Sequence, residues 1–208
     1  DLDAATVLLQ WATGGLFFLW DTGRRREVGI GYGWTMRITF GLMAAGGVAV
    51  GVLFEPQPVR DTFGALMLGA TMVALGVSAV RRKAGVTGQR GTEERRTARV
   101  AAMTGIDKDA QTFSDGPEFP AHLDLLAPLL GVVALVAGGI HAGHPAWISV
   151  ARVLIGALFL GAISDAMLLG HWYLVQPGLA RGPLIELVWW SGLLWPFELA
   201  VLLWPTGM

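Results

Sequence analysis

Long runs of apolar residues alternate with short polar segments along the whole chain. The runs lie near residues 4–20, 37–54, 62–80, 123–140, 147–173 and 183–204. Most approach the roughly 20 residues that an α-helix needs to cross ~30 Å of hydrocarbon. The pattern therefore predicts an all-α, polytopic membrane bundle of about six transmembrane helices that form a single domain over residues 1–208. The fifth run is long, which favours a tilted or protruding helix.

The composition agrees with a membrane protein. Hydrophobic residues make up 53% of the chain and charged residues only 15%, against roughly 25% charged in soluble proteins. The absence of cysteine excludes disulfides, thiolate metal sites and iron–sulfur ligation. A net charge of −1 gives no indication of nucleic-acid binding. Lipid and other membrane subunits are the expected partners.

Basic residues indicate the orientation of the predicted helices. If the 81–120 loop is cytoplasmic, 13 of the 15 Lys and Arg residues lie on the cytoplasmic side, and only Arg60 and Arg152 lie outside. The positive-inside rule then places both termini outside the cell (cytoplasmic or inner) membrane.

The 81–120 loop is the largest polar segment. Residues 92–103 can form a helix with Thr92 as its N-cap. This helix is either a solvated surface that only fixes the topology, or a contact with the membrane surface or a partner subunit. A loop of this size with one short helix cannot form a catalytic core. No catalytic residue is assigned, and we expect any chemistry to belong to the membrane helices.

Ionisable residues within a membrane span are costly and therefore suggest function. In an antiparallel hairpin of the last two spans, His171 reaches the depth of Glu186, and Arg152 that of Glu198. Both are candidate intramembrane ion pairs. Asp165 has no charged residue at its depth and lies about 13 Å from the end of its helix at ~1.5 Å per residue. An unpaired carboxyl group there favours its neutral form, so Asp165 is the candidate proton or ion relay.

Residues 170–174 place an imidazole, an indole and a phenol in succession at a membrane interface. His171 or Tyr173 can hydrogen-bond a quinone head group, and Trp172 can stack on it. The same residues also suit an aromatic anchor at the interface. The sequence therefore leaves the cofactor unknown, with quinone as the candidate that this cluster allows.

The four histidines also allow metal or haem sites. His141 and His144 have a spacing that binds one metal ion if the turn is helical, but Gly143 and Pro145 disfavour a helix. His122 and His171 are the pair that can approach each other for haem b, and the expected position of His122 outside the hydrocarbon disfavours it.

These features favour one function and leave another open. The leading hypothesis is an integral subunit of a larger, bioenergetic or redox membrane complex, without catalytic activity of its own, that is structural or contacts a quinone. Glycine-rich helix faces, such as Gly47 and Gly51, support close packing with other helices. The alternative is a small transporter or a proton- or cation-conducting protein that uses Asp165. Segments 24–34 and 170–179 are distinctive, but neither matches a motif of known chemistry.

Overall fold

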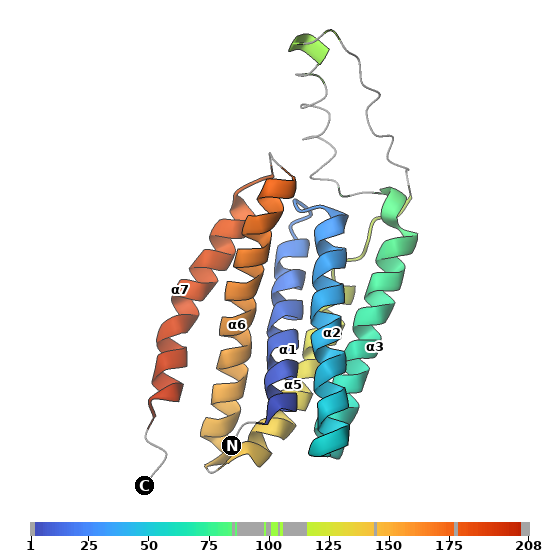
Figure 1. Cartoon of the computed structure of the whole chain (residues 1–208). Coiled ribbons are helices and arrows are strands. Elements are labelled where there is room, and N and C mark those ends of the chain that lie inside the picture. The colour runs from blue at the N-terminus through green and yellow to red at the C-terminus, as the bar shows by residue number, and fades with distance from the viewer. Residues whose placement is uncertain are drawn as a thin grey trace.

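In the computed structural model, the described residues are 3–84, 86, 98, 101–103, 105, 116–143, 145–176 and 179–204. In these ranges the protein is all-helical (Figure 1). The long helices and one short 3-10 helix are α1 (Ala4–Gly23), α2 (Ile30–Phe54), α3 (Pro58–Val80), η1 (Arg82–Ala84), α5 (Leu123–Ala142), α6 (Ala146–Val175) and α7 (Gly182–Leu202).

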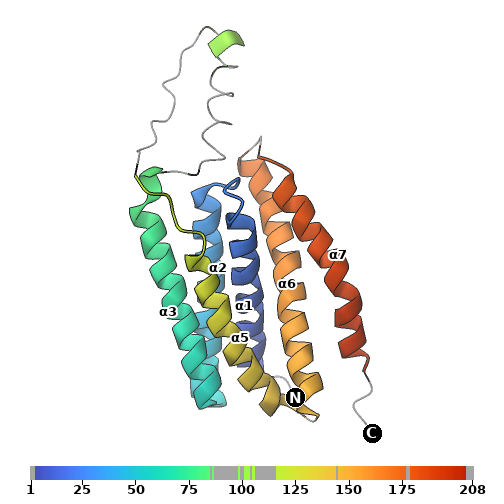
Figure 2. The same ribbon diagram turned by 180° about the vertical axis from the view of Figure 1, so that it is seen from behind.

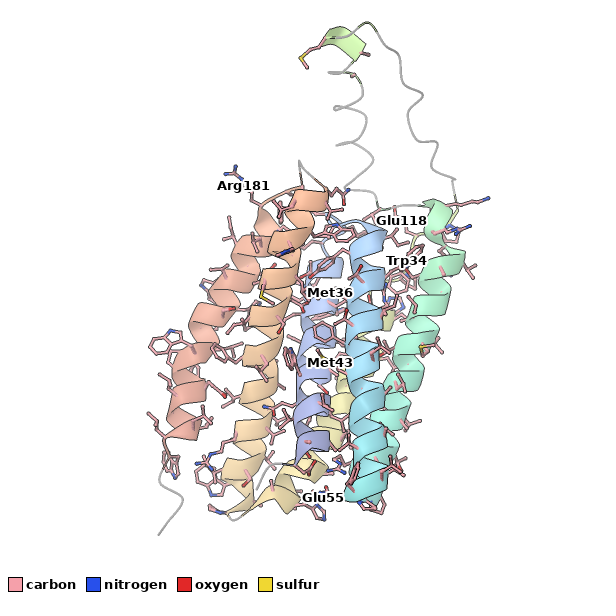
Figure 3. All side chains as sticks on the ribbon, viewed as in Figure 1. Trp34, Met36, Met43, Glu55, Glu118 and Arg181 are labelled. Carbon is pink, nitrogen blue, oxygen red and sulfur yellow. The ribbon has the colours of Figure 1, made fainter. Side chains whose placement is uncertain are left out.

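The helices form a bundle around α1. Helix α1 packs against α2, α5 and α6, while α3 packs against α2 and α5. Helix α7 packs mainly on α6 and lies at one edge of the bundle (Figures 1 and 2). We call the end of the bundle that carries residues 24–29, 118–122 and 179–181 the loop end. In Figure 3, Glu118 and Arg181 lie at this end and Glu55 lies at the opposite end.

Among the described helices, α2, α3, α5, α6 and α7 are long and apolar enough to cross a membrane. The protein is therefore a multi-pass membrane protein whose outer helix faces contact lipid. Helix α1 is similar in length but contains buried polar residues, including Gln10, Thr13 and Asp21. Its central place explains this composition, because its neighbours are protein helices and not lipid.

Glycines allow α1 and α6 to touch backbone to backbone. A Cβ atom on Gly14 would overlap the carbonyl group of Ala157, and one on Gly161 would overlap the backbone of Gly14. The two helices run in the same direction (Figure 1), so this contact sets their relative depth. At 1.5 Å per residue, the end of α1 is level with about residue 168, and α6 continues for about two turns beyond it.

A buried arginine joins three segments at the end opposite the loops. The Arg60 side chain is fully buried. It donates hydrogen bonds to the carboxylates of Asp3 (2.7 Å) and Asp61 (2.9 Å) and to the backbone oxygen of Glu55 (2.7 Å). The buried guanidinium is thus paired with two carboxylates, and the network ties the start of α1 to α3.

A second buried arginine joins α2, α3 and α5 near the loop end. Arg37 donates two hydrogen bonds to Asp124, of 2.8 and 2.6 Å, and a third of 3.3 Å to Ser78. Its guanidinium lies 4.4 Å from the centre of the Phe119 ring. The second apolar run was predicted to begin near residue 37. That boundary is wrong, because α2 begins at Ile30 and Arg37 is a buried residue within the helix.

The other helices lie close to the predicted runs. Helix α6 has 30 residues, in line with the long fifth run. Of the predicted helix over 92–103, residues 98 and 101–103 belong to the described part and are helical. The rest of that segment, including Thr92, lies outside the described residues.

Candidate functional site

Asp165 is a fully buried carboxyl group in the second half of α6. Its exposed fraction is 0%, and within the described residues neither carboxyl oxygen has a hydrogen-bond partner. On the scale set by the contact between α1 and α6, Asp165 lies about one turn before the level at which α1 ends. Because α6 extends beyond α1, Asp165 is closer to the loop end of the bundle than its distance from the end of α6 suggests. A buried carboxylate without a partner is costly, which sets Asp165 apart from the paired Asp61 and Asp124 carboxylates.

Polar groups of α1 and α2 surround Asp165. The Tyr32 hydroxyl, on the first turn of α2, donates a long hydrogen bond of 3.5 Å to the backbone oxygen of Asp165. Next to Asp165, the Ser164 hydroxyl accepts a 2.7 Å hydrogen bond from the Trp11 indole. None of these contacts supplies a positive charge to Asp165.

Tyr32 also lines a cavity of about 60 Å³ at the loop end. The polar walls of this cavity include Arg37, Ser78 and Asp124, and Phe119 and Ala121 belong to the segment that covers it. A water molecule needs roughly 10–15 Å³ of such space and two to four polar partners. The cavity therefore has room for a few waters, with hydrogen-bonding groups to hold them.

The 116–121 segment is fastened over this cavity by two arginines. Arg26, between α1 and α2, forms an ion pair of 3.1 Å with the Glu118 carboxylate. Arg81, at the end of α3, donates a 2.9 Å hydrogen bond to the backbone oxygen of Glu118. The segment thereby connects to both sides of the cavity.

The predicted aromatic cluster lies on the last turns of α6, but its three side chains have different surroundings. His171 is exposed. Trp172 packs edge-on against Tyr32, with ring centres 6.0 Å apart, and donates a 3.1 Å hydrogen bond to Gln176. Tyr173 donates a hydrogen bond to the backbone oxygen of Ala180. The two distinctive sequence segments thus meet where Tyr32 packs against Trp172.

Glu186 pairs with arginines and not with His171. Its carboxylate accepts from Arg24 (3.1 Å) and also forms an ion pair with Arg25. Its hydrogen bond raises the pKa of Arg25 above the ordinary value. Arg24 also binds Asp21 at 2.8 Å. The cluster therefore fastens the start of α7 to the end of α1.

Arg152 binds backbone oxygens and not Glu198. Its guanidinium donates to the carbonyl groups of Val201 (2.7 Å) and Trp204 (3.0 Å) at the end of α7. One Glu198 carboxyl oxygen is buried without a hydrogen-bond partner in the described residues. Gln10 of α1 and Glu198 both approach Gly156 of α6. Polar side chains of α1 and α7 thus lie beside the same point of α6, nearer the end opposite the loops.

The histidines form no cluster in the described structure. The Nδ1 atom of His141 lies 2.9 Å from the backbone oxygen of Ala137, and His144 lies outside the described residues. Among the described residues, no group of three or more His, Asp or Glu side chains is placed to hold a metal ion. His122 precedes α5 and is exposed, as is His171.

Sequence reasoning singled out Asp165 but missed its neighbours. Tyr32 reaches Asp165 from α2, 133 residues away in the chain, and it shares a cavity with the buried Arg37–Asp124 pair of α2 and α5. One available signal was the 31–34 segment, in which Tyr32 and Trp34 each follow a glycine. Comparison of the chain with protein-family models, curated proteins and solved structures gives no match. The function is therefore argued from the site.

Proposed function

We propose that this protein moves protons across the membrane and that Asp165 is the group that binds the proton. The observation that carries the proposal is a completely buried carboxyl group whose two oxygens have no partner among the described residues. Such a group stabilises no contact that the described residues show, although burying it is costly. Reversible protonation accounts for a carboxyl group at this position.

A proton fits this site better than a metal cation. Sites for hard cations such as Ca²⁺ provide six to eight oxygen ligands around the ion. Within the described residues, no other side chain binds the Asp165 carboxyl oxygens. A proton needs only the carboxyl group itself, and it removes the cost of a buried negative charge.

The proposal includes an orientation. We propose six spans with both termini outside and the 81–120 loop in the cytoplasm of a cell membrane. The distribution of Lys and Arg supports this arrangement, since Arg60 and Arg152 lie at the end opposite the loops. The similar length of α1 and its central place between α2, α5 and α6 support counting it as the sixth span.

A flux assay on the purified protein in liposomes tests the proposal. A trapped pH-sensitive dye reports proton entry under a potassium–valinomycin potential. We expect Asp165→Asn to abolish the flux. The matched control Glu55→Gln makes the same carboxyl-to-amide change at an exposed position and should keep wild-type flux. Unchanged flux in Asp165→Asn would contradict the proposal.

Infrared spectroscopy gives a second readout that does not depend on flux. A protonated carboxyl group has a carbonyl stretching band separate from that of a carboxylate. We expect such a band in the wild type and its absence in Asp165→Asn. A wild-type spectrum without this band would show that Asp165 is ionised and would contradict its role as a proton carrier.

A second proposal is that the protein is a quinone-contacting subunit of a larger redox complex. The exposure of His171 favours it, because α6 extends past α1 here and presents the imidazole outside the bundle. Gentle extraction followed by native mass spectrometry and visible absorbance tests this proposal. Co-migration with cofactor-bearing subunits, and loss of the complex's activity in His171→Ala without loss of assembly, are the expected results. A colourless protein without partners would contradict it.

A further inference from the structure

Tyr32 stands between the loop-end cavity and Asp165. Its ring is 2% exposed and lines the cavity wall. Its hydroxyl contacts the backbone oxygen of Asp165 at 3.5 Å. Normal O–H···O hydrogen bonds are 2.5–3.0 Å long, so this hydroxyl is weakly held. A small rotation about the C–O bond redirects its hydrogen without displacing the ring.

We propose that the Tyr32 hydroxyl transfers protons between water in this cavity and Asp165, forming the cytoplasmic entrance to the site. This inference rests on the proposed function of Asp165 and adds the route by which the proton arrives. A phenol both donates and accepts hydrogen bonds. The 3.5 Å contact is with the backbone oxygen of Asp165, so transfer requires the Asp165 side chain to rotate towards the Tyr32 hydroxyl. In that rotamer the phenol passes its own hydrogen to the carboxylate while it accepts a proton from water. One proton enters and one leaves, so tyrosine ends unchanged.

The charges around this route favour transfer. The cavity wall contains Arg37 and Asp124, which neutralise each other through two hydrogen bonds. Arg26 and Glu118 form another pair at the cover. The cavity lining can therefore hold water between balanced charge pairs.

Packing keeps Tyr32 in place for this transfer. The Trp172 ring lies edge-on against Tyr32 at 6.0 Å, and a side chain on Gly31 would crowd the same indole. Trp172 in turn is held by Gln176 through a 3.1 Å hydrogen bond. Tyr32 and Trp172 therefore act as a positioning pair, and only the phenol hydroxyl is free to turn.

Exchange of the Asp165 proton for deuterium, followed by infrared spectroscopy, tests the entrance directly. The carbonyl stretching band of protonated Asp165 is assigned by its absence in Asp165→Asn, and it shifts when deuterium replaces the proton. We expect Tyr32→Phe to keep this band but to slow the rate of its shift in D₂O by at least ~10-fold, since a positioned proton-transfer group typically contributes 10²–10⁴-fold. The control Trp34→Phe alters an aromatic on the same helix whose indole binds Ser78 of α3. It should exchange within ~2-fold of the wild type.

A second variant blocks the cavity without touching Tyr32. Ala121 lines the cavity, and Ala121→Phe should fill it and slow exchange while the band remains. Wild-type exchange in Tyr32→Phe, or loss of the band there, would overturn the inference.

If Asp165→Asn abolishes flux while Tyr32→Phe exchanges normally, the function stands and the entrance lies elsewhere. If Asp165→Asn keeps flux, the function fails, and the exchange rates still test Tyr32.

Discussion

The indole nitrogen of Trp11 donates a 2.7 Å hydrogen bond to the hydroxyl of Ser164, the residue beside the buried carboxyl group. The bond joins α1 to α6 within the bundle, where few polar partners exist. Removing the acceptor leaves a partly buried N–H group unsatisfied. We therefore expect Ser164→Ala to cost about 1–3 kcal/mol, measured as a lower thermal unfolding temperature in detergent. Ser191→Ala is the control, because its hydroxyl binds only a backbone oxygen of its own helix. Equal losses in both variants would count against this bond.

The contact between α1 and α6 tolerates no side chain at Gly14. A methyl group there would overlap the backbone of Ala157, so the helices would have to separate. We expect Gly14→Ala to destabilise the protein by more than about 2 kcal/mol. The matched control is Gly69→Ala on α3, where an added Cβ meets nothing within 4 Å. That change should be neutral or stabilising by up to ~1 kcal/mol.

The Arg37–Asp124 pair should be structural. Both side chains are about 5% exposed, and removing one partner of a buried pair typically costs about 3–5 kcal/mol. We expect Asp124→Asn to lower the unfolding temperature much more than Arg181→Met, which changes an exposed arginine. The double variant Arg37→Met with Asp124→Leu should recover part of the loss, because no unpaired charge remains. A double variant as unstable as the sum of the single variants would contradict this.

Removing the Asp165 carboxylate should not destabilise the protein, in contrast to Asp124→Asn. Its carboxyl oxygens make no hydrogen bond in the described structure, so Asp165→Asn removes no stabilising contact. We expect its free energy of unfolding to differ from that of the wild type by at most about 1 kcal/mol, so that the two unfolding temperatures nearly coincide. A loss as large as that of Asp124→Asn would show that Asp165 supports the fold.

The proposed orientation can be tested by cysteine labelling, because the chain contains no native cysteine. Lys83, in the short helix after α3, and His141, at the end of α5, are both exposed. In intact cells, a membrane-impermeant maleimide should label His141→Cys and spare Lys83→Cys until the membrane is opened. The reverse labelling would invert the topology and place the Tyr32 entrance outside.

Hydrophobic runs predicted the helices well because a membrane span must bury its backbone within one continuous apolar segment. The start of α2 was missed since Arg37 reads as a span boundary, and its partner Asp124 lies far away in the chain. Helix counting along the fifth run singled out Asp165 as a carboxyl group without a charged residue at its depth. Its level relative to the end of α1 and its contact with Tyr32 did not follow, because no local pattern links α6 to α1 or α2.

The central place of α1 has a consequence for biosynthesis. This helix leaves the ribosome before the other described helices, but partners of its polar groups come later. Arg60 of α3 binds Asp3, and Ser164 of α6 binds Trp11. During synthesis, we expect α1 to stay near the insertion machinery, with the Trp11 N–H group unsatisfied, until most of the chain has been made. A premature stop before α6 would release a product whose first helix cannot settle in the bilayer, and membrane quality control should remove it.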